Sequence, residues 1–143
     1  MNYNKIFKRC FSGALNISGI NYIARRVNTK KTNVLLYHSV VRDDMYASEL
    51  DFADISMPAS IFEKQVIYLK ENFNILSLDD YFFKGGGIKT NSPNVIINFD
   101  DGYLDNFTEA YPVLKRHNIK ASFFISSFFI DINSMLWFNQ LEN

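Results

Sequence analysis

Short apolar runs alternate with amphipathic stretches along the chain from residue 32 onward. Val34–His38 (VLLYH) is an apolar run bounded by polar residues, which is typical of a buried parallel strand. Val95–Phe99 and Ala121–Ile125 have the same character, so the sequence predicts three core strands. The stretch 41–57 lacks sustained periodicity, and we interpret it as a long loop.

A helix is predicted over residues 60–72. Ser60 followed by Glu63 forms a capping-box signature at its start. The apolar residues behind it repeat with helical spacing: Phe62, Val66, Leu69 and Phe73. This stripe indicates one face packed against a core.

Two more helices and a short strand are predicted further along. Asn74–Leu76 is expected to form a brief strand, and Ser77–Asp80 to cap a short helix ending at Gly85–Gly87. The segment 105–117 is helical in pattern, and Pro112 starts or kinks it because proline lacks the amide donor. Strand, helix and strand in this order form a βαβ unit, so we expect an α/β fold with a parallel sheet.

The charge of the chain is segregated, although its net charge is zero. Residues 1–31 are predicted to form a helical arm before the domain at 32–143. The first 42 residues contain no Asp or Glu and eight basic residues: Lys5, Lys8, Arg9, Arg25, Arg26, Lys30, Lys31 and Arg42. Such an arm either contacts an anionic membrane surface peripherally or is a solvated helix docked on its own domain.

Composition narrows the compartment and the partners. With 143 residues and 48% hydrophobic content, the chain can bury one core. Cys10–Ala24 is only mildly apolar, so neither a transmembrane helix nor a clear signal peptide is indicated. A single cysteine, Cys10, fits a reducing compartment. We therefore expect a cytoplasmic protein, membrane-associated if the arm binds lipid, and no nucleic-acid partner.

Two adjacent carboxylates, Asp100 and Asp101, follow the second core strand directly. Like charges so close resist joint ionisation, and a divalent metal can compensate for them. One carboxylate would bind the metal while the other takes a proton from water, and Gly102 would let the backbone turn sharply. The alternative is a turn in which either aspartate caps the next helix. A haloacid-dehalogenase-type phosphotransferase fits poorly, since it needs Asp-x-Asp rather than adjacent aspartates.

The residues around this pair resemble the polysaccharide deacetylase family (NodB-homology domain, carbohydrate esterase family 4). The resemblance covers most of residues 34–141. It is carried by five segments: Val34–Val40, Asn98–Phe107 (NFDDGYLDNF), Ala110–Lys115 (AYPVLK), Ala121–Ile125 (ASFFI) and Met135–Phe138. It implies the N-terminal portion of a distorted (β/α) barrel, with three parallel strands present and the rest absent. We expect such a fragment to be marginally stable.

The resemblance also implies a reaction and roles for residues. Asp100 matches the catalytic base and Asp101 a metal-binding aspartate, commonly on zinc. Gly102 and Tyr103 would lie close to the site. The reaction would be metal-assisted hydrolysis of the acetamide of an N-acetylated oligo- or polysaccharide, a carbon–nitrogen bond, which releases acetate.

The histidines depart from the family pattern. Family members complete the metal site with His-Ser/Thr-x-x-His, which this sequence lacks. His38 begins a similar run, but Arg42 stands where the second histidine should be. His38 ends the first core strand, at the edge that also holds Asp100, so it is either near the site or a core histidine. His117 is predicted to end a helix. An inactive remnant or a carbohydrate-binding module of the same fold is therefore the alternative to an enzyme.

Overall fold

A parallel sheet with β5 at its centre forms the framework of the protein. The computed structural model describes residues 31–46, 55–84 and 92–127. Strand β5 (Asn94–Phe99) pairs on one side with β1 (Thr32–Tyr37). It also pairs with β4 (Asn74–Leu76) along its first half and with β6 (Ser122–Phe123) at its end. Every pairing is parallel, which confirms the predicted α/β class.

The segment predicted as a long loop is partly ordered into regular structure. Strand β2 (Ser39–Val41) pairs in parallel with β3 (Ser56–Pro58), and a short helix, α3 (Asp43–Tyr46), follows β2. The prediction of a loop over 41–57 is wrong at these positions. At three residues each, β2 and β3 are too short to show a periodic pattern of their own.

The helices occur close to the positions that the sequence predicts. Helix α4 (Ala59–Asn72) and α5 (Leu78–Phe83) occur where expected, and Ser77 caps α5 by accepting a hydrogen bond from the Asp80 amide at 3.1 Å. The predicted helix over 105–117 is a π-helix, η2 (Asn106–Ala110), continued by α6 (Tyr111–His117), with Pro112 in the first turn of α6.

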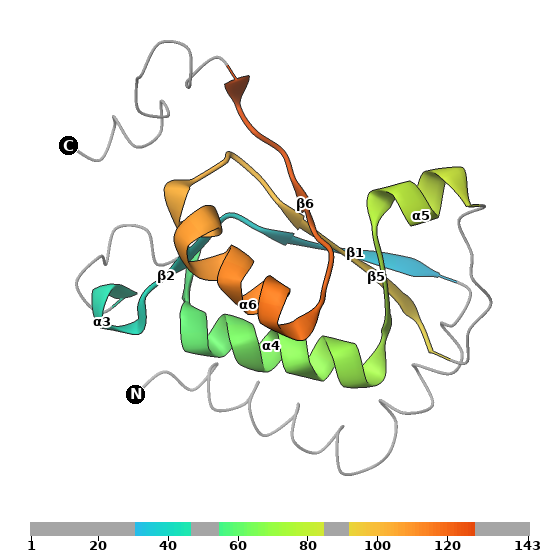
Figure 1. Cartoon of the computed structure of the whole chain (residues 1–143), viewed down its shortest axis with the longest axis horizontal. Coiled ribbons are helices and arrows are strands. Elements are labelled where there is room, and N and C mark those ends of the chain that lie inside the picture. The colour runs from blue at the N-terminus through green and yellow to red at the C-terminus, as the bar shows by residue number, and fades with distance from the viewer. Residues whose placement is uncertain (1–30, 47–54, 85–91, 128–143) are drawn as a thin grey trace, which may run out of the picture.

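The main core lies between the sheet and two helices. Figure 1 shows α4 and α6 packed on the same face of the sheet. Tyr37, Phe62 and Phe99 meet at its centre with ring centroids 5.2–5.7 Å apart. Val66 and Val113 also belong to this cluster, so both helices contribute apolar side chains to it.

The opposite face of β1 is open. Val34 and Leu36 are 57% and 53% exposed, while Leu35 and Tyr37 point to the core side. The prediction of a buried strand is therefore wrong for one face of β1. The third predicted strand, 121–125, is shorter than expected, because only Ser122–Phe123 pairs with β5.

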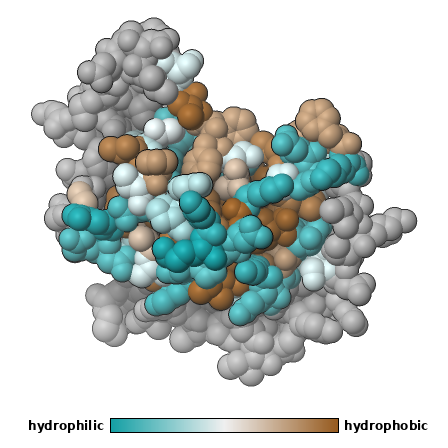
Figure 2. All heavy atoms as spheres, viewed as in Figure 1, coloured by the Kyte–Doolittle hydropathy of each residue, from teal (hydrophilic) through white to brown (hydrophobic). Residues whose placement is uncertain are grey.

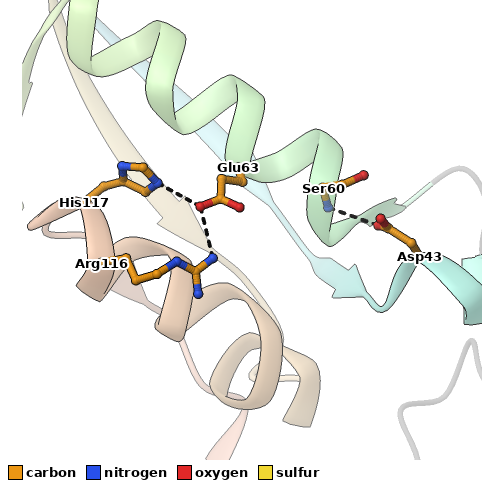
Figure 3. A network of polar contacts seen from close by, with 5 residues as sticks. All are labelled: Asp43, Ser60, Glu63, Arg116 and His117. Atoms are coloured by element: carbon orange, nitrogen blue, oxygen red, sulfur yellow. Dashed lines mark hydrogen bonds and ion pairs between the residues drawn. The ribbon is translucent and has the colours of Figure 1, made fainter.

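A polar network ties the helices together at the edge of this core (Figure 3). Glu63 on α4 accepts a hydrogen bond from Arg116 at 3.0 Å and lies 2.9 Å from Nε2 of His117. The Ser60 amide donates to the Asp43 carboxylate at 3.0 Å, 17 residues away in sequence. The predicted capping box between Ser60 and Glu63 is thus wrong, since both groups bond to residues of other helices.

Within the residues that the structure describes, no helix has the length and apolar character required to cross a bilayer. The predicted arm at 1–31 lies almost wholly outside these residues.

Candidate active site

The parallel register of β1 and β5 brings two predicted site residues to one edge of the sheet. Tyr37 is the register partner of Phe99, so His38 and Asp100 follow adjacent strand ends. The Asp100 amide donates to the Tyr37 carbonyl at 2.9 Å, which continues the ladder one step past the strands. His38 and Asp100 are both half-buried. Both can therefore contact a ligand at this edge.

The turn after Asp100 has an unusual backbone. Asp101 and Gly102 are consecutive residues with positive φ, +70° and +72°. Aspartate tolerates this region better than most residues, and glycine adopts it freely. A Cβ at Gly102 would also lie 3.0 Å from Cγ2 of Ile125. The backbone thus turns sharply here, and consecutive left-handed residues are typical of functional sites.

Asp105 connects this turn to the residues after β1 through hydrogen bonds. Its carboxylate accepts hydrogen bonds from the Ser39 hydroxyl at 2.5 Å and from the Val40 amide at 3.3 Å. These bonds span more than 60 positions in the sequence. They hold the segment after His38 against the segment after Asp101. Asp105 therefore fixes the position of one half of the candidate site relative to the other.

A cleft of about 460 Å³ opens beside the turn. Gly102 and Tyr103 line one part of it, together with residues of η2, α6 and β6: Asn106, Phe107, Tyr111 and Phe123. Figure 2 shows apolar side chains gathered on the face where these elements meet. Of the predicted site residues, Gly102 and Tyr103 therefore contribute to a cavity.

The described residues do not by themselves form a metal centre. In 31–46, 55–84 and 92–127, no three His, Cys, Asp or Glu side chains are grouped as a metal ion requires. Asp101 and His38 provide two candidate ligands, whereas a catalytic zinc ion commonly has three protein ligands. His117, as predicted, ends a helix, and its ring lies against Glu63.

Two residues of the site were missed by the sequence analysis. Asp105 and Asn106 lie inside a predicted helix, where polar residues are ordinarily solvated. Asn106 is only 3% exposed. Their only signal was their position within the DDGYLDN run, directly after the paired aspartates.

Comparison with known proteins gives consistent matches. Residues 87–137 match the family model described as polysaccharide deacetylase. Over 97 residues the chain is 30% identical to YxkH of Bacillus subtilis, which is classed as a polysaccharide deacetylase; the match covers 66% of this chain and 32% of that protein. It is 32% identical over 81 residues to the poly-beta-1,6-N-acetyl-D-glucosamine N-deacetylase of Staphylococcus aureus, with coverage of 56% and 28%.

A solved structure supports the same assignment. The de-N-acetylase from Aggregatibacter actinomycetemcomitans is 28% identical and superposes with a TM-score of 0.59, over 73% of this chain and 42% of that one. The chain spans about a third of the length of the curated relatives that it matches. The fold expectation of a partial (β/α) barrel is thereby confirmed.

Proposed function

Because the chain belongs to the polysaccharide deacetylase family and carries the N-terminal part of its domain, we propose that the protein is a carbohydrate N-deacetylase. The substrate would be an oligo- or polysaccharide of N-acetylated sugars, the class on which the Staphylococcus aureus relative acts by its name. The products would be acetate and a free amino sugar. The observation that carries this proposal is the Asp100–Asp101–Gly102 turn at the strand edge shared with His38.

In this proposal Asp100 is the catalytic base. A water oxygen attacks the acetamide carbonyl carbon, and the Asp100 carboxylate takes the proton that the water loses. The bond between that carbon and the amine nitrogen then breaks, and the Asp100 carboxyl returns the proton to that nitrogen, which leaves as the amine. Asp105 and Gly102 act as positioning residues, since they fix the backbone that carries Asp100 and Asp101.

Metal dependence, with zinc as the favoured ion, is part of the proposal by family resemblance alone. Asp101 is the aspartate that would bind the cation. His38 follows the end of the adjacent strand β1 and is the second candidate ligand. Two such groups fall short of a catalytic zinc site. We therefore derive no step of the reaction through a metal.

Among the residues that the structure describes, Asp101 and His38 are two candidate metal ligands where a catalytic zinc site commonly has three, so a second candidate function is carbohydrate binding without hydrolysis. In that case the aromatic cleft beside the turn would hold sugar, and no acetate would be released.

A cytoplasmic location and membrane contact through residues 1–31 also remain proposals, drawn from the basic sequence of that arm.

Acetate release from N-acetylglucosamine oligomers tests the enzymatic proposal. The native protein should release acetate. Asp100→Asn should lower the rate of acetate release by roughly 100-fold or more, as expected for loss of a general base. Asp79→Asn is the matched control, because Asp79 is an exposed carboxylate on α5.

Three results would decide between the candidates. Loss of activity in Asp100→Asn alone supports the deacetylase. Equal activity in Asp100→Asn and the native protein rejects Asp100 as the base. Sugar binding by the native protein with no acetate release, with or without added zinc, supports the binding module.

A further inference from the structure

The walls of the cleft beside the Asp100–Gly102 turn are apolar and uncharged, yet much of their surface is exposed. None of the side chains that line this cleft of about 460 Å³ is an acid or a base of the Asp, Glu, Lys or Arg type. Large apolar residues that line it and remain exposed are Leu104, Phe107, Tyr111, Phe123 and Ile125. Exposed apolar surface gathered at one place typically marks a docking site.

Two of the walls are aromatic. Phe107 and Tyr111 stack with ring centroids 6.0 Å apart and planes 7° apart. On the strand side, Phe123 stacks on Phe99 with centroids 4.8 Å apart. Rings held in this way offer flat faces and edges against which a further aromatic side chain packs favourably. The cleft therefore suits an uncharged occupant that contains an aromatic residue.

A segment of this composition begins at the rim of the cleft. The described part of the chain ends at Ser127, two residues after Ile125, and residues 128–143 follow. Met135–Phe138 (MLWF) is an uninterrupted apolar run within that segment. The ten residues from Ser127 to Trp137 span roughly 15 Å as a helix or about 33 Å when extended, so Trp137 can reach the cleft.

The other stretches outside the described residues match the cleft less well. Residues 1–30 contain six Lys or Arg side chains, and 47–54 (ASELDFAD) contains three acidic ones. Residues 85–91 (GGGIKTN) contain no aromatic side chain. Burying an unpaired charge against an uncharged wall is costly, which disfavours the first two. Residues 128–143 thus have the composition that the cleft requires.

We propose that residues 128–143 dock in this cleft, with Trp137 packed against Phe107. The Ile125 side chain lies so close to Gly102 that an added Cβ there would approach it to 3.0 Å. The docked segment therefore forms a wall of the candidate site beside the turn. A cleft filled in this way is closed to sugar, which removes the binding place of the second candidate function. Substrate would then contact the edge that Asp100 shares with His38.

Tryptophan fluorescence of the 143-residue chain tests the docking. Trp137 is the only tryptophan in the chain, so its emission reports on this segment alone. In the native chain we expect emission at shorter wavelength than in the urea-unfolded chain, and weaker quenching by acrylamide. Phe107→Ser and Leu104→Ser should each shift the emission toward that of the unfolded chain. Phe82→Ser is the matched control, because Phe82 on α5 and Phe107 are both 69% exposed, and it should leave the emission unchanged.

Thermal midpoints provide a second measurement that does not depend on fluorescence. Trp137→Ala and Phe107→Ser should each lower the midpoint. The double variant should lower it by less than the sum of the two, because both substitutions remove the same contact. The effects of Trp137→Ala and Phe82→Ser should add. Far-ultraviolet circular dichroism shows whether each variant is folded.

Three results would overturn the docking. The first is a native Trp137 that acrylamide quenches as strongly as in the unfolded chain. The second is native emission in both Phe107→Ser and Leu104→Ser. The third is a burial of Trp137 that is lost on dilution, which would assign the cleft to a second copy of the chain. Acetate release by the native protein is measured separately and supports the deacetylase whichever of these results is found.

Discussion

At Gly102 both the backbone conformation and the neighbouring side chain disfavour any larger residue. Its φ of +72° is unfavourable for any residue with a Cβ, and an added Cβ would approach Ile125 to 3.0 Å. Gly102→Ala should therefore lower the free energy of unfolding by about 1–3 kcal/mol. Urea unfolding followed by circular dichroism measures this difference.

Asp101→Gly provides the matched comparison, because Asp101 has nearly the same φ, +70°. Glycine adopts this conformation without strain, so stability should be unchanged or slightly higher. A Gly102→Ala protein as stable as the native chain would contradict the steric explanation. It would mean that the turn can adopt another backbone conformation.

At the scale of elements, Glu63 links α4 to α6 through a titratable contact. Hydrogen bonds from His117 and Arg116 lower the pKa of Glu63 below its ordinary value of 4.5. A carboxylate with a lowered folded-state pKa stabilises the fold above its unfolded pKa, and this contribution is lost as the pH falls through the folded value. Glu63→Gln should therefore destabilise the protein at pH 7 but have little effect near pH 2.

Thermal midpoints of the native chain and Glu63→Gln, measured from pH 7 to pH 2, test this link. Glu71→Gln is the control, because Glu71 is an exposed residue of the same helix. A difference between Glu63→Gln and the native chain that stays constant down to pH 2 would show that the contact does not act through ionisation of Glu63.

The same elements show how far sequence alone determined the fold. Helix α4 was predictable because Phe62, Val66 and Leu69 are all buried on one face, which fixes their spacing. Its cap was not, since the group that bonds the Ser60 amide is Asp43, on a different helix. A capping box is a local pattern, and it cannot reveal a partner supplied by tertiary structure.

Part of the candidate site was likewise predictable from the sequence, and part was not. The shared edge of His38 and Asp100 was predictable, because strands of a parallel sheet end on the same side. The roles of Asp105 and Asn106 were not, since one depends on contacts with Ser39 and the other on burial within a π-helix. Periodicity predicts which face of a helix is polar, but not which polar residue is enclosed.

At the scale of the whole molecule, the face of β1 that points away from the core exposes apolar side chains. Val34 and Leu36 are both more than half exposed, and their register partners are Ile96 and Asn98 of β5. In the part of the chain that the structure describes, the outer edge of β1 pairs with no strand. An unpaired edge next to an apolar face favours association between chains.

We therefore predict that the 143-residue chain self-associates through β1. Val34→Thr with Leu36→Thr keeps β propensity, so stability should change by less than about 1 kcal/mol, while the monomer fraction rises. Sedimentation velocity over a range of concentrations measures this fraction. Ile67→Ser, at a 39% exposed position on α4, is the control and should leave association unchanged. If the double variant associates as strongly as the native chain, another surface is responsible; if the native chain is monomeric at every concentration, the open face of β1 does not drive association.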